Sequence, residues 1–245
     1  MHIEIIRLEE TGSTNDYLRS LPTPPADTIT VATALYQTAG RGQGTNKWES
    51  ENGKNLLFSI LTCPESVTIT SQFVLSMAGA LALKEALDLY CNGISLKWPN
   101  DIYWHDRKIS GTLIETSVVG KTIKRCIYGI GLNVNQQVFH SDAPNPVSLF
   151  NITGTETPLD KLLDSILVSF QKYYQLATNG FHERITADYN AALYRGTGIH
   201  HYKDNTTGEL FAASIDHVGT DGLLHLVDSQ GGRRTYSLKE VKFII

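Results

Sequence analysis

The sequence predicts an α+β fold, in which a mixed β-sheet carries helices mainly on one face and is followed by a small β-barrel of SH3 type. Three observations predict it. The middle of the chain is rich in strand patterns, helical patterns lie before and after this middle, and the composition changes after Tyr194. We therefore expect a main domain over residues 1–194 and a small C-terminal domain over residues 195–245.

The first part of the chain predicts a strand, a short helix and two strands that frame a glycine-rich loop. The segment HIEIIRL alternates apolar and polar residues, which favours a strand. Ser13, with Asp16 three positions later, is typical of a helix N-cap, and this helix should end near Pro22. The Thr- and Val-rich run at 28–36 and the apolar run at 55–62 predict strands. The loop between them is therefore held at both ends.

The middle of the chain predicts one long helix and a set of strands. Apolar residues recur at helical spacing over residues 72–90, which we expect to form the longest helix. The strand patterns that follow are ISLKW, IYW, KISGTLIETSVV and TIKRCIYGIGLNV. Turn residues separate them at Pro99, Asp106 and Gly120. Residues 160–176 and 182–193 predict a second helical layer.

The end of the chain predicts a compact set of short strands. The strand patterns are GIHHY, ELFAASIDHV, LLHLV, RRTY and VKFI, and the turns between them include DNTTG, GTDG and SQGG. This spacing is typical of a small SH3-type barrel. The sequence has no internal repeat, low-complexity segment or long linker, so we expect the barrel to pack against the main domain.

Charge, cysteine content and hydropathy limit the class of protein. A formal net charge of -4 gives no overall basic character, so we expect no nucleic-acid partner. The three cysteines are far apart and lack metal-ligand spacing, which argues for a reducing compartment. The N-terminal segment is acidic where a signal peptide would be basic, and no apolar run could span a bilayer. We therefore expect a soluble, cytoplasmic protein without a membrane partner.

The glycine-rich segment YQTAGRGQGTNKW, residues 36–48, is the first candidate binding element. Its glycines let the backbone approach a ligand and turn N–H groups toward an anion. Arg41 and Lys47 would add charge-assisted hydrogen bonds, and Trp48 offers a flat face on which a purine can stack. Taken alone, such a cluster is more often a mobile surface loop.

The segment KWPNDIYWHDRKISG has more polar groups than a pair of strands requires. Pro99 predicts a bend that presents Asn100 and Asp101. Lys108 falls inside the next strand, where an apolar or neutral residue is commoner, and Gly111 leaves space for a ligand. The alternative is a solvated hairpin with surface charges. Two such clusters in one domain favour a binding site.

The tripeptide Ser13-Thr14-Asn15 lies at the start of a predicted helix. Capping explains Ser13, whereas Thr14 and Asn15 could instead hydrogen-bond a neutral polar group such as a urea. Other signatures are missing from the sequence: there is no GxxxxGK[ST] phosphate loop and no GxSxG elbow. The adjacent His200 and His201 would point to opposite faces of a strand, so we predict no protein metal site.

Five motifs, in order and spacing, resemble the biotin protein ligase family. They are STN at 13–15, YQTAGRGQG with KW at 36–48, KWPND at 97–101, DRKISG at 106–111 and GIGLNVN at 129–135. The resemblance covers nearly the whole chain and implies the class II synthetase-like mixed sheet of biotin and lipoate ligases. It also implies a two-step reaction. The biotin carboxylate attacks the α-phosphate of ATP, giving biotinyl-5′-adenylate and pyrophosphate, and a lysine of an acceptor domain then takes the biotinyl group.

The resemblance implies a role for each candidate residue. The ureido ring of biotin would be bound by Ser13, Thr14, Asn15 and Gln37, in a pocket lined by Gly111. The residues that would fold over biotin and the adenylate are Arg41, Gly42 and Gln43. The residues that would meet the nucleotide are Lys47 at phosphate, Trp48 on adenine, and Asn100 and Asn133 on the adenylate. Catalysis would fall to Lys108, between biotin carboxylate and α-phosphate, to Arg41, and to Asp101, which would orient or deprotonate the acceptor lysine.

The resemblance implies biotin and ATP as substrates, with Mg²⁺, and the biotin carboxyl carrier domain of a carboxylase as partner. A homodimer is one possible assembly. Gln43 and Asn46 stand where arginines are frequent in the family, so the loop has fewer cations with which to retain the adenylate. Our hypothesis is that Arg41, Lys47 and Lys108 suffice. The first motif begins at Ser13, so we expect a ligase without a DNA-binding domain. The alternatives are a lipoate or octanoate ligase, whose usual SGGG loop is absent here, and a non-catalytic biotin- or nucleotide-binding module.

Overall fold

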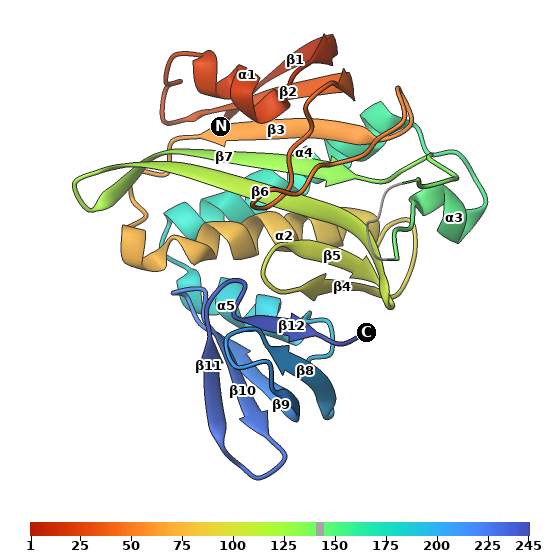
Figure 1. The fold of residues 1–245 in the computed structure, drawn as a ribbon. Helices are drawn as coiled ribbons and strands as arrows, with labels where there is room; N and C mark the ends of the chain where they lie inside the picture. Colours follow the sequence, from red (N-terminus) through yellow and green to blue (C-terminus); the bar gives the residue numbers. More distant parts are fainter. Residues whose placement is uncertain (141–144) are drawn as a thin grey trace.

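A seven-stranded mixed sheet forms the larger part of the molecule (Figure 1). The computed structural model describes residues 1–140 and 145–245, and the strand order of this sheet is β1-β2-β3-β7-β6-β5-β4. The strands are β1 (His2–Thr11), β2 (Thr28–Gln37), β3 (Leu56–Thr62), β4 (Ile94–Lys97), β5 (Asp101–Trp104), β6 (Arg107–Val119) and β7 (Thr122–Leu132). Strands β1 and β2 are parallel, and the other neighbours pair antiparallel.

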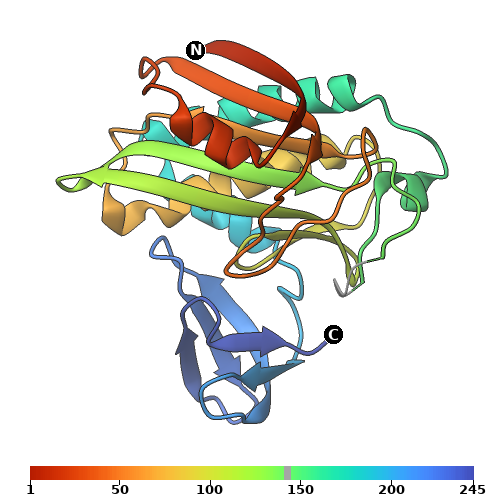
Figure 2. The ribbon, with the colours of Figure 1, turned by 45° about the horizontal axis from the view of Figure 1, so that its top comes forward.

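Helices cover mainly one face of this sheet, as the sequence predicts. Helices α2 (Phe73–Leu87), α4 (Leu159–Thr178) and α5 (His182–Ala191) lie together behind the sheet in Figure 2, whereas α1 (Thr14–Ser20) lies in front of it. Under α1, a small separate cluster of apolar side chains contains Leu18, Ala32, Leu61 and Ile127. The rest of the front face is crossed by the loop between β2 and β3.

The longest helix is α4, with 20 residues, and the prediction that residues 72–90 form the longest helix is wrong. Helix α2 has 15 residues, because the chain leaves the helix after Leu87 and turns at Gly93, with φ +88°, into β4. Most of α2 is buried, since it packs against α4 and α5 and against strands β4 and β5. Helix α4 is amphipathic and continues to Thr178, close to Gly180 at φ +83°. A short helix that the sequence did not predict, α3 (Leu149–Thr153), starts with a capping box.

A second sheet of five antiparallel strands follows, in the order β11-β10-β9-β8-β12. Its strands are β8 (His200–Asp204), β9 (Leu210–Val218), β10 (Leu224–Asp228), β11 (Arg233–Tyr236) and β12 (Val241–Phe243). Its core contains stacked and edge-on aromatic rings of Tyr202, Phe211, Tyr236 and Phe243. The predicted small β module is therefore confirmed.

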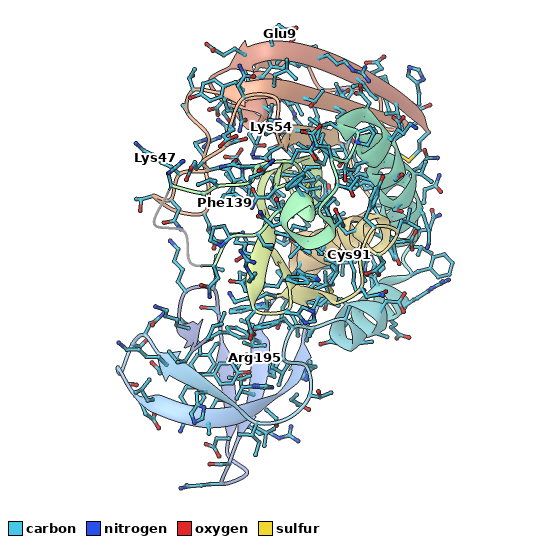
Figure 3. The ribbon with its side chains drawn as sticks, turned by 90° about the vertical axis from the view of Figure 1, so that its right-hand side faces the viewer. Glu9, Lys47, Lys54, Cys91, Phe139 and Arg195 are labelled. Atoms are coloured by element: carbon cyan, nitrogen blue, oxygen red, sulfur yellow. The ribbon has the colours of Figure 1, made fainter. Side chains whose placement is uncertain are left out.

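This module packs against the main sheet, and Arg195 lies at the junction (Figure 3). The Trp98 indole N–H donates to the Gly222 carbonyl at 3.0 Å. The Asn190 side chain accepts from the Val218 N–H at 2.7 Å and donates to the Val218 carbonyl at 3.1 Å. No helix among residues 1–140 and 145–245 combines the length and apolar character needed to cross a membrane.

Candidate active site

A cavity of about 560 Å³ lies where the glycine-rich loop crosses the sheet. Every candidate residue from the sequence lines it: Ser13, Thr14, Asn15, Gln37, Arg41, Gly42, Gln43, Lys47, Trp48, Asn100, Asp101, Lys108, Gly111 and Asn133. These residues come from α1, β2, the loop, β5, β6 and the end of β7. The structure thus brings the candidates together, while their individual roles stay predictions.

One end of the cavity is a chain of hydrogen-bonded amides and hydroxyls. The Thr14 N–H donates to Gln37 Oε1 at 2.7 Å. The Ser59 hydroxyl lies 2.7 Å from Thr14 Oγ1 and 2.6 Å from Asn15 Oδ1. Asn15 Nδ2 donates to Glu115 Oε2 at 2.8 Å. The groups of this chain that line the cavity are uncharged and fixed in orientation, which suits a neutral polar ligand group.

Ser59 is fully buried and was not among the residues predicted from the sequence. Its signal was a single hydroxyl inside the apolar strand NLLFSILT. Ser13 occupies the N-cap position of α1, but its side chain makes no capping hydrogen bond. Capping therefore does not explain Ser13, and that interpretation of the sequence is wrong.

The floor of the cavity is made of glycines on β6 and β7. A Cβ at Gly129 would lie 2.1 Å from Asn15 Oδ1, and one at Gly131 would lie 2.2 Å from Trp48 Cε2. Residues two apart on a strand face the same side, so β7 accommodates both side chains on one surface. A Cβ at Gly111 would lie 3.1 Å from the Lys108 ammonium and 3.3 Å from the Trp48 ring. The sequence analysis assigned a role to Gly111 only, although the GxG spacing was visible.

Lys108 and Asp101 form an ion pair in the cavity wall, with Nζ 2.5 Å from Oδ1. Their side chains are 26% and 15% exposed, so the pair is less screened by water than a surface pair. Two asparagine side chains that line the cavity form hydrogen bonds with the backbone. Asn100 Nδ2 donates to the Thr112 carbonyl, and Asn133 Nδ2 donates to the Val147 carbonyl. These two residues therefore also brace the wall.

The glycine-rich loop is a tight hairpin in this structure. Gly42 N–H donates to the Asn46 carbonyl at 2.7 Å, and Trp48 N–H donates to the Gly40 carbonyl at 3.1 Å. Lys47 projects outward near Phe139 (Figure 3). The buried Trp48 indole N–H has no hydrogen-bond partner within the described part of the chain.

Lys97 also lines the cavity, and the sequence analysis did not select it, although it opens the KWPND motif. Its ammonium lies 5.0 Å from the ring centroids of both Tyr103 and Phe243. Burial lowers the pKa of Lys97 from its ordinary value. The charged side chains around the cavity are the cations Arg41, Lys47, Lys97 and Lys108 and the carboxylates Glu49 and Asp101. This excess of cations favours an anionic ligand in the cavity.

The model of the Biotin/lipoate A/B protein ligase family matches residues 8–133, which include four of the five motifs in full. The chain belongs to this family. The Bifunctional ligase/repressor BirA of Bacillus subtilis is 30% identical over 234 residues, covering 92% of this chain and 70% of the relative. The Biotin--[acetyl-CoA-carboxylase] ligase of Paracoccus denitrificans is 31% identical over 226 residues, covering 86% and 88%.

Solved structures of the ligase family share the fold. The biotin protein ligase of Aquifex aeolicus, in complex with biotin and ATP, superposes with a TM-score of 0.81 at 23% identity, covering 98% of this chain and 99% of that chain. The biotin protein ligase of Leishmania major, in complex with biotinyl-5-AMP, gives 0.67 at 22% identity, covering 96% and 99%. The likeness extends through the C-terminal module and supports the predicted α+β mixed sheet.

Proposed function

We propose that this protein is a biotin protein ligase, which activates biotin with ATP to biotinyl-5′-adenylate and transfers the biotinyl group to a lysine of a carrier domain. The observation that carries the proposal is one cavity with a neutral hydrogen-bonding end and a cationic end. Biotin has a neutral ureido ring at one end and a carboxylate at the other. The family and the ligands of the Aquifex aeolicus and Leishmania major ligases support the same assignment.

Biotin binds with its ureido ring at the amide end, where Ser13, Thr14, Asn15 and Gln37 line the wall. The ring offers both N–H donors and a carbonyl acceptor, which an amide and hydroxyl chain can match. Gly111 lines the pocket, and the loop residues Arg41, Gly42 and Gln43 cover the ligand. Asn15, one of these polar groups, is hydrogen-bonded to Ser59 and Glu115.

Lys108 stands between the biotin carboxylate and the α-phosphate. Two anions repel at this step, so positive charge held at the reacting centre lowers the barrier. Lys108 is paired with Asp101, which keeps the ammonium in place. The carboxylate oxygen attacks phosphorus, pyrophosphate leaves, and Arg41, Lys47 and Lys108 oppose the charge that develops on the phosphate oxygens.

The adenine ring stacks on Trp48, which lies flat against Gly131. Asn100 and Asn133 contact the adenylate. No group of three His, Cys, Asp or Glu side chains gathers within the described residues, so a cation in this cavity would be held largely by substrate phosphates. The donors present fit Mg²⁺, since Asp101 and Glu49 offer the one or two carboxylates it needs beside a triphosphate. When bound, Mg²⁺ neutralises phosphate charge.

In the second step the acceptor lysine attacks the carbonyl of the adenylate, the bond between that carbonyl and the phosphate oxygen breaks, and AMP leaves as the amide forms. Asp101 orients the attacking amine or takes its proton. We assign the catalytic role to residues 1–194 and treat 195–245 as the SH3-like appendage. The acceptor is a biotin carboxyl carrier domain.

A cytoplasmic location is part of the proposal, supported by free Cys63, Cys91 and Cys126. The homodimer and the lack of a nucleic-acid partner stay predictions.

The proposal is tested by exchange of labelled pyrophosphate into ATP by the purified protein. We expect exchange with biotin and background rates with lipoate or octanoate. Addition of a biotin carboxyl carrier domain should then give one biotinylated lysine, detected by mass spectrometry. Exchange with lipoate instead would favour the lipoate ligase, and binding of biotin without exchange would favour a non-catalytic module.

Replacing Gln43 by arginine should slow escape of the adenylate. Gln43 lies where the cavity meets the groove beside the C-terminal module, so a guanidinium there adds a cation near the phosphate. We expect roughly two- to tenfold slower release of biotinyl-adenylate, the scale of one partly exposed charge-assisted contact. Release is measured by trapping labelled adenylate on a filter, with Gln43→Met as the control. If Gln43→Arg and the wild type release at one rate, the missing cation is not what sets retention.

A further inference from the structure

Four charged side chains fasten the glycine-rich loop to the sheet and to α1. Arg41 of the loop donates to Asp16 of α1 at 2.9 Å and to Glu115 of β6 at 3.4 Å. Arg19 of α1 donates to the same two carboxylates, at 2.5 Å and 2.6 Å. Two arginines and two carboxylates thus alternate around a closed ring. We call Asp16, Arg19, Arg41 and Glu115 the arginine–carboxylate ring.

Glu115 differs from Asp16 because it also belongs to the amide chain. Its Oε2 accepts from Asn15 Nδ2 at 2.8 Å, and its Oε1 accepts from Arg19. Asn15 in turn lies 2.6 Å from the Ser59 hydroxyl through its own Oδ1. The Glu115 carboxylate therefore connects Asn15, which lines the cavity, to Arg41, which belongs to the glycine-rich loop. Neither Asp16 nor Glu115 lines the cavity itself.

The ion pairs of the ring can break reversibly. Its side chains are between 27% and 50% exposed, and ion pairs of this exposure are individually weak. A loop that admits two substrates and then covers a reactive intermediate needs a closure that is reversible. The two positive and two negative charges sum to zero, so the ring carries no net charge.

We propose that Glu115 is a positioning residue that couples occupancy of the amide end to closure of the glycine-rich loop. A ligand that forms a hydrogen bond with Asn15 fixes the orientation of the Asn15 amide. The amide then holds the Glu115 carboxylate in the position in which it binds Arg41. The coupling is reciprocal, so the factor by which ligand favours the closed loop equals the factor by which closure tightens ligand binding. This inference rests on the proposed function for the identity of the ligand, biotin.

Trypsin cleavage after Arg41 measures the closure directly. A protease must draw Arg41 out of the ring, so the initial cleavage rate, followed by mass spectrometry, reports the open loop. For the wild type we expect biotin to slow this cleavage. Asp16→Asn should speed cleavage without ligand by roughly two- to fivefold, the scale of one exposed ion pair, while protection by biotin stays at the wild-type factor.

Glu115→Gln tests the coupling itself, whereas Asp16→Asn tests only the ion pairs of the ring. It keeps an acceptor for Asn15 but loses the charge that Arg41 and Arg19 share, so we expect faster cleavage together with a smaller protection factor. The dissociation constant of biotin, measured by calorimetry, should rise in step with the protection that is lost. Asp160→Asn is the matched control, since it removes an exposed ion pair to Arg7 far from the loop. Equal thermal unfolding of all variants excludes a general loss of fold.

Two results would overturn the coupling. One is full biotin protection in Glu115→Gln, and the other is loss of protection in Asp16→Asn, because Asp16 does not touch Asn15. Calorimetric titration of the wild type with biotin keeps the two proposals apart. Absence of binding there removes the proposed function and the coupling with it, whereas normal binding with unchanged protection in Glu115→Gln removes the coupling alone.

Discussion

Lys108→Met should lower biotin-dependent pyrophosphate exchange by roughly two to three orders of magnitude, the loss typical for a group that stabilises transition-state charge. The ammonium is held 2.5 Å from Asp101 at the cationic end of the cavity, where the carboxylate and α-phosphate must meet. Methionine keeps an unbranched side chain of nearly the same length beside Gly111 and removes the charge together with its N–H donors. Binding of biotin, measured by calorimetry, should change much less than exchange.

The fold of Lys108→Met should survive, with the free energy of unfolding reduced by about 1 kcal/mol because Asp101 loses its partner. Lys108→Met with Asp101→Asn should recover that loss without restoring exchange, which separates stability from chemistry. Lys54→Met is the control, because it removes an exposed lysine paired with Glu156 outside the cavity. Exchange at the wild-type rate in Lys108→Met would remove Lys108 from the mechanism.

Residues that act within one motif could be predicted from the sequence, because their spacing is local. Alternation and turn residues predicted β6 and β7, and the polar residues of the motifs meet in one cavity because they flank adjoining strands. Ser59 and Glu115 could not be predicted in the same way. Their partner Asn15 is 44 and 100 residues away, so only the packing of α1 on the sheet brings them together.

The lengths of the helices show the same limit. Periodicity predicted a helix over residues 72–90, but it ends at Leu87, where the chain must turn to start β4. The position of the next strand sets where this helix ends. The spacing of apolar residues does not reveal that position. For Lys97, the Phe243 ring that covers it comes from the second sheet, so its partly buried ammonium was visible only after the two sheets were placed together.

Gly131→Ala should weaken ATP binding strongly and leave biotin binding unchanged. The new methyl group would lie 2.2 Å from Trp48 Cε2. Strand β7 pairs with β3 on one side and β6 on the other, so its backbone cannot retreat and the indole must leave the floor. Loss of base stacking is worth about 1–3 kcal/mol, so the KM for ATP should rise roughly 5- to 150-fold. Steady-state exchange kinetics measure both substrates in one experiment.

Gly129→Ala provides the matched comparison, because its methyl group would meet Asn15 Oδ1 at 2.1 Å instead of Trp48. It should therefore raise the KM for biotin and spare that for ATP, the reverse of Gly131→Ala. Both substitutions place alanine in a strand, where it is no worse than glycine for the backbone, so a shared loss of stability would not produce opposite effects. If Gly131 acts through the indole, adding Gly131→Ala to Trp48→Ala should cause no further loss of ATP affinity. Additive losses in that double variant would mean that the glycine serves the nucleotide by a route other than Trp48.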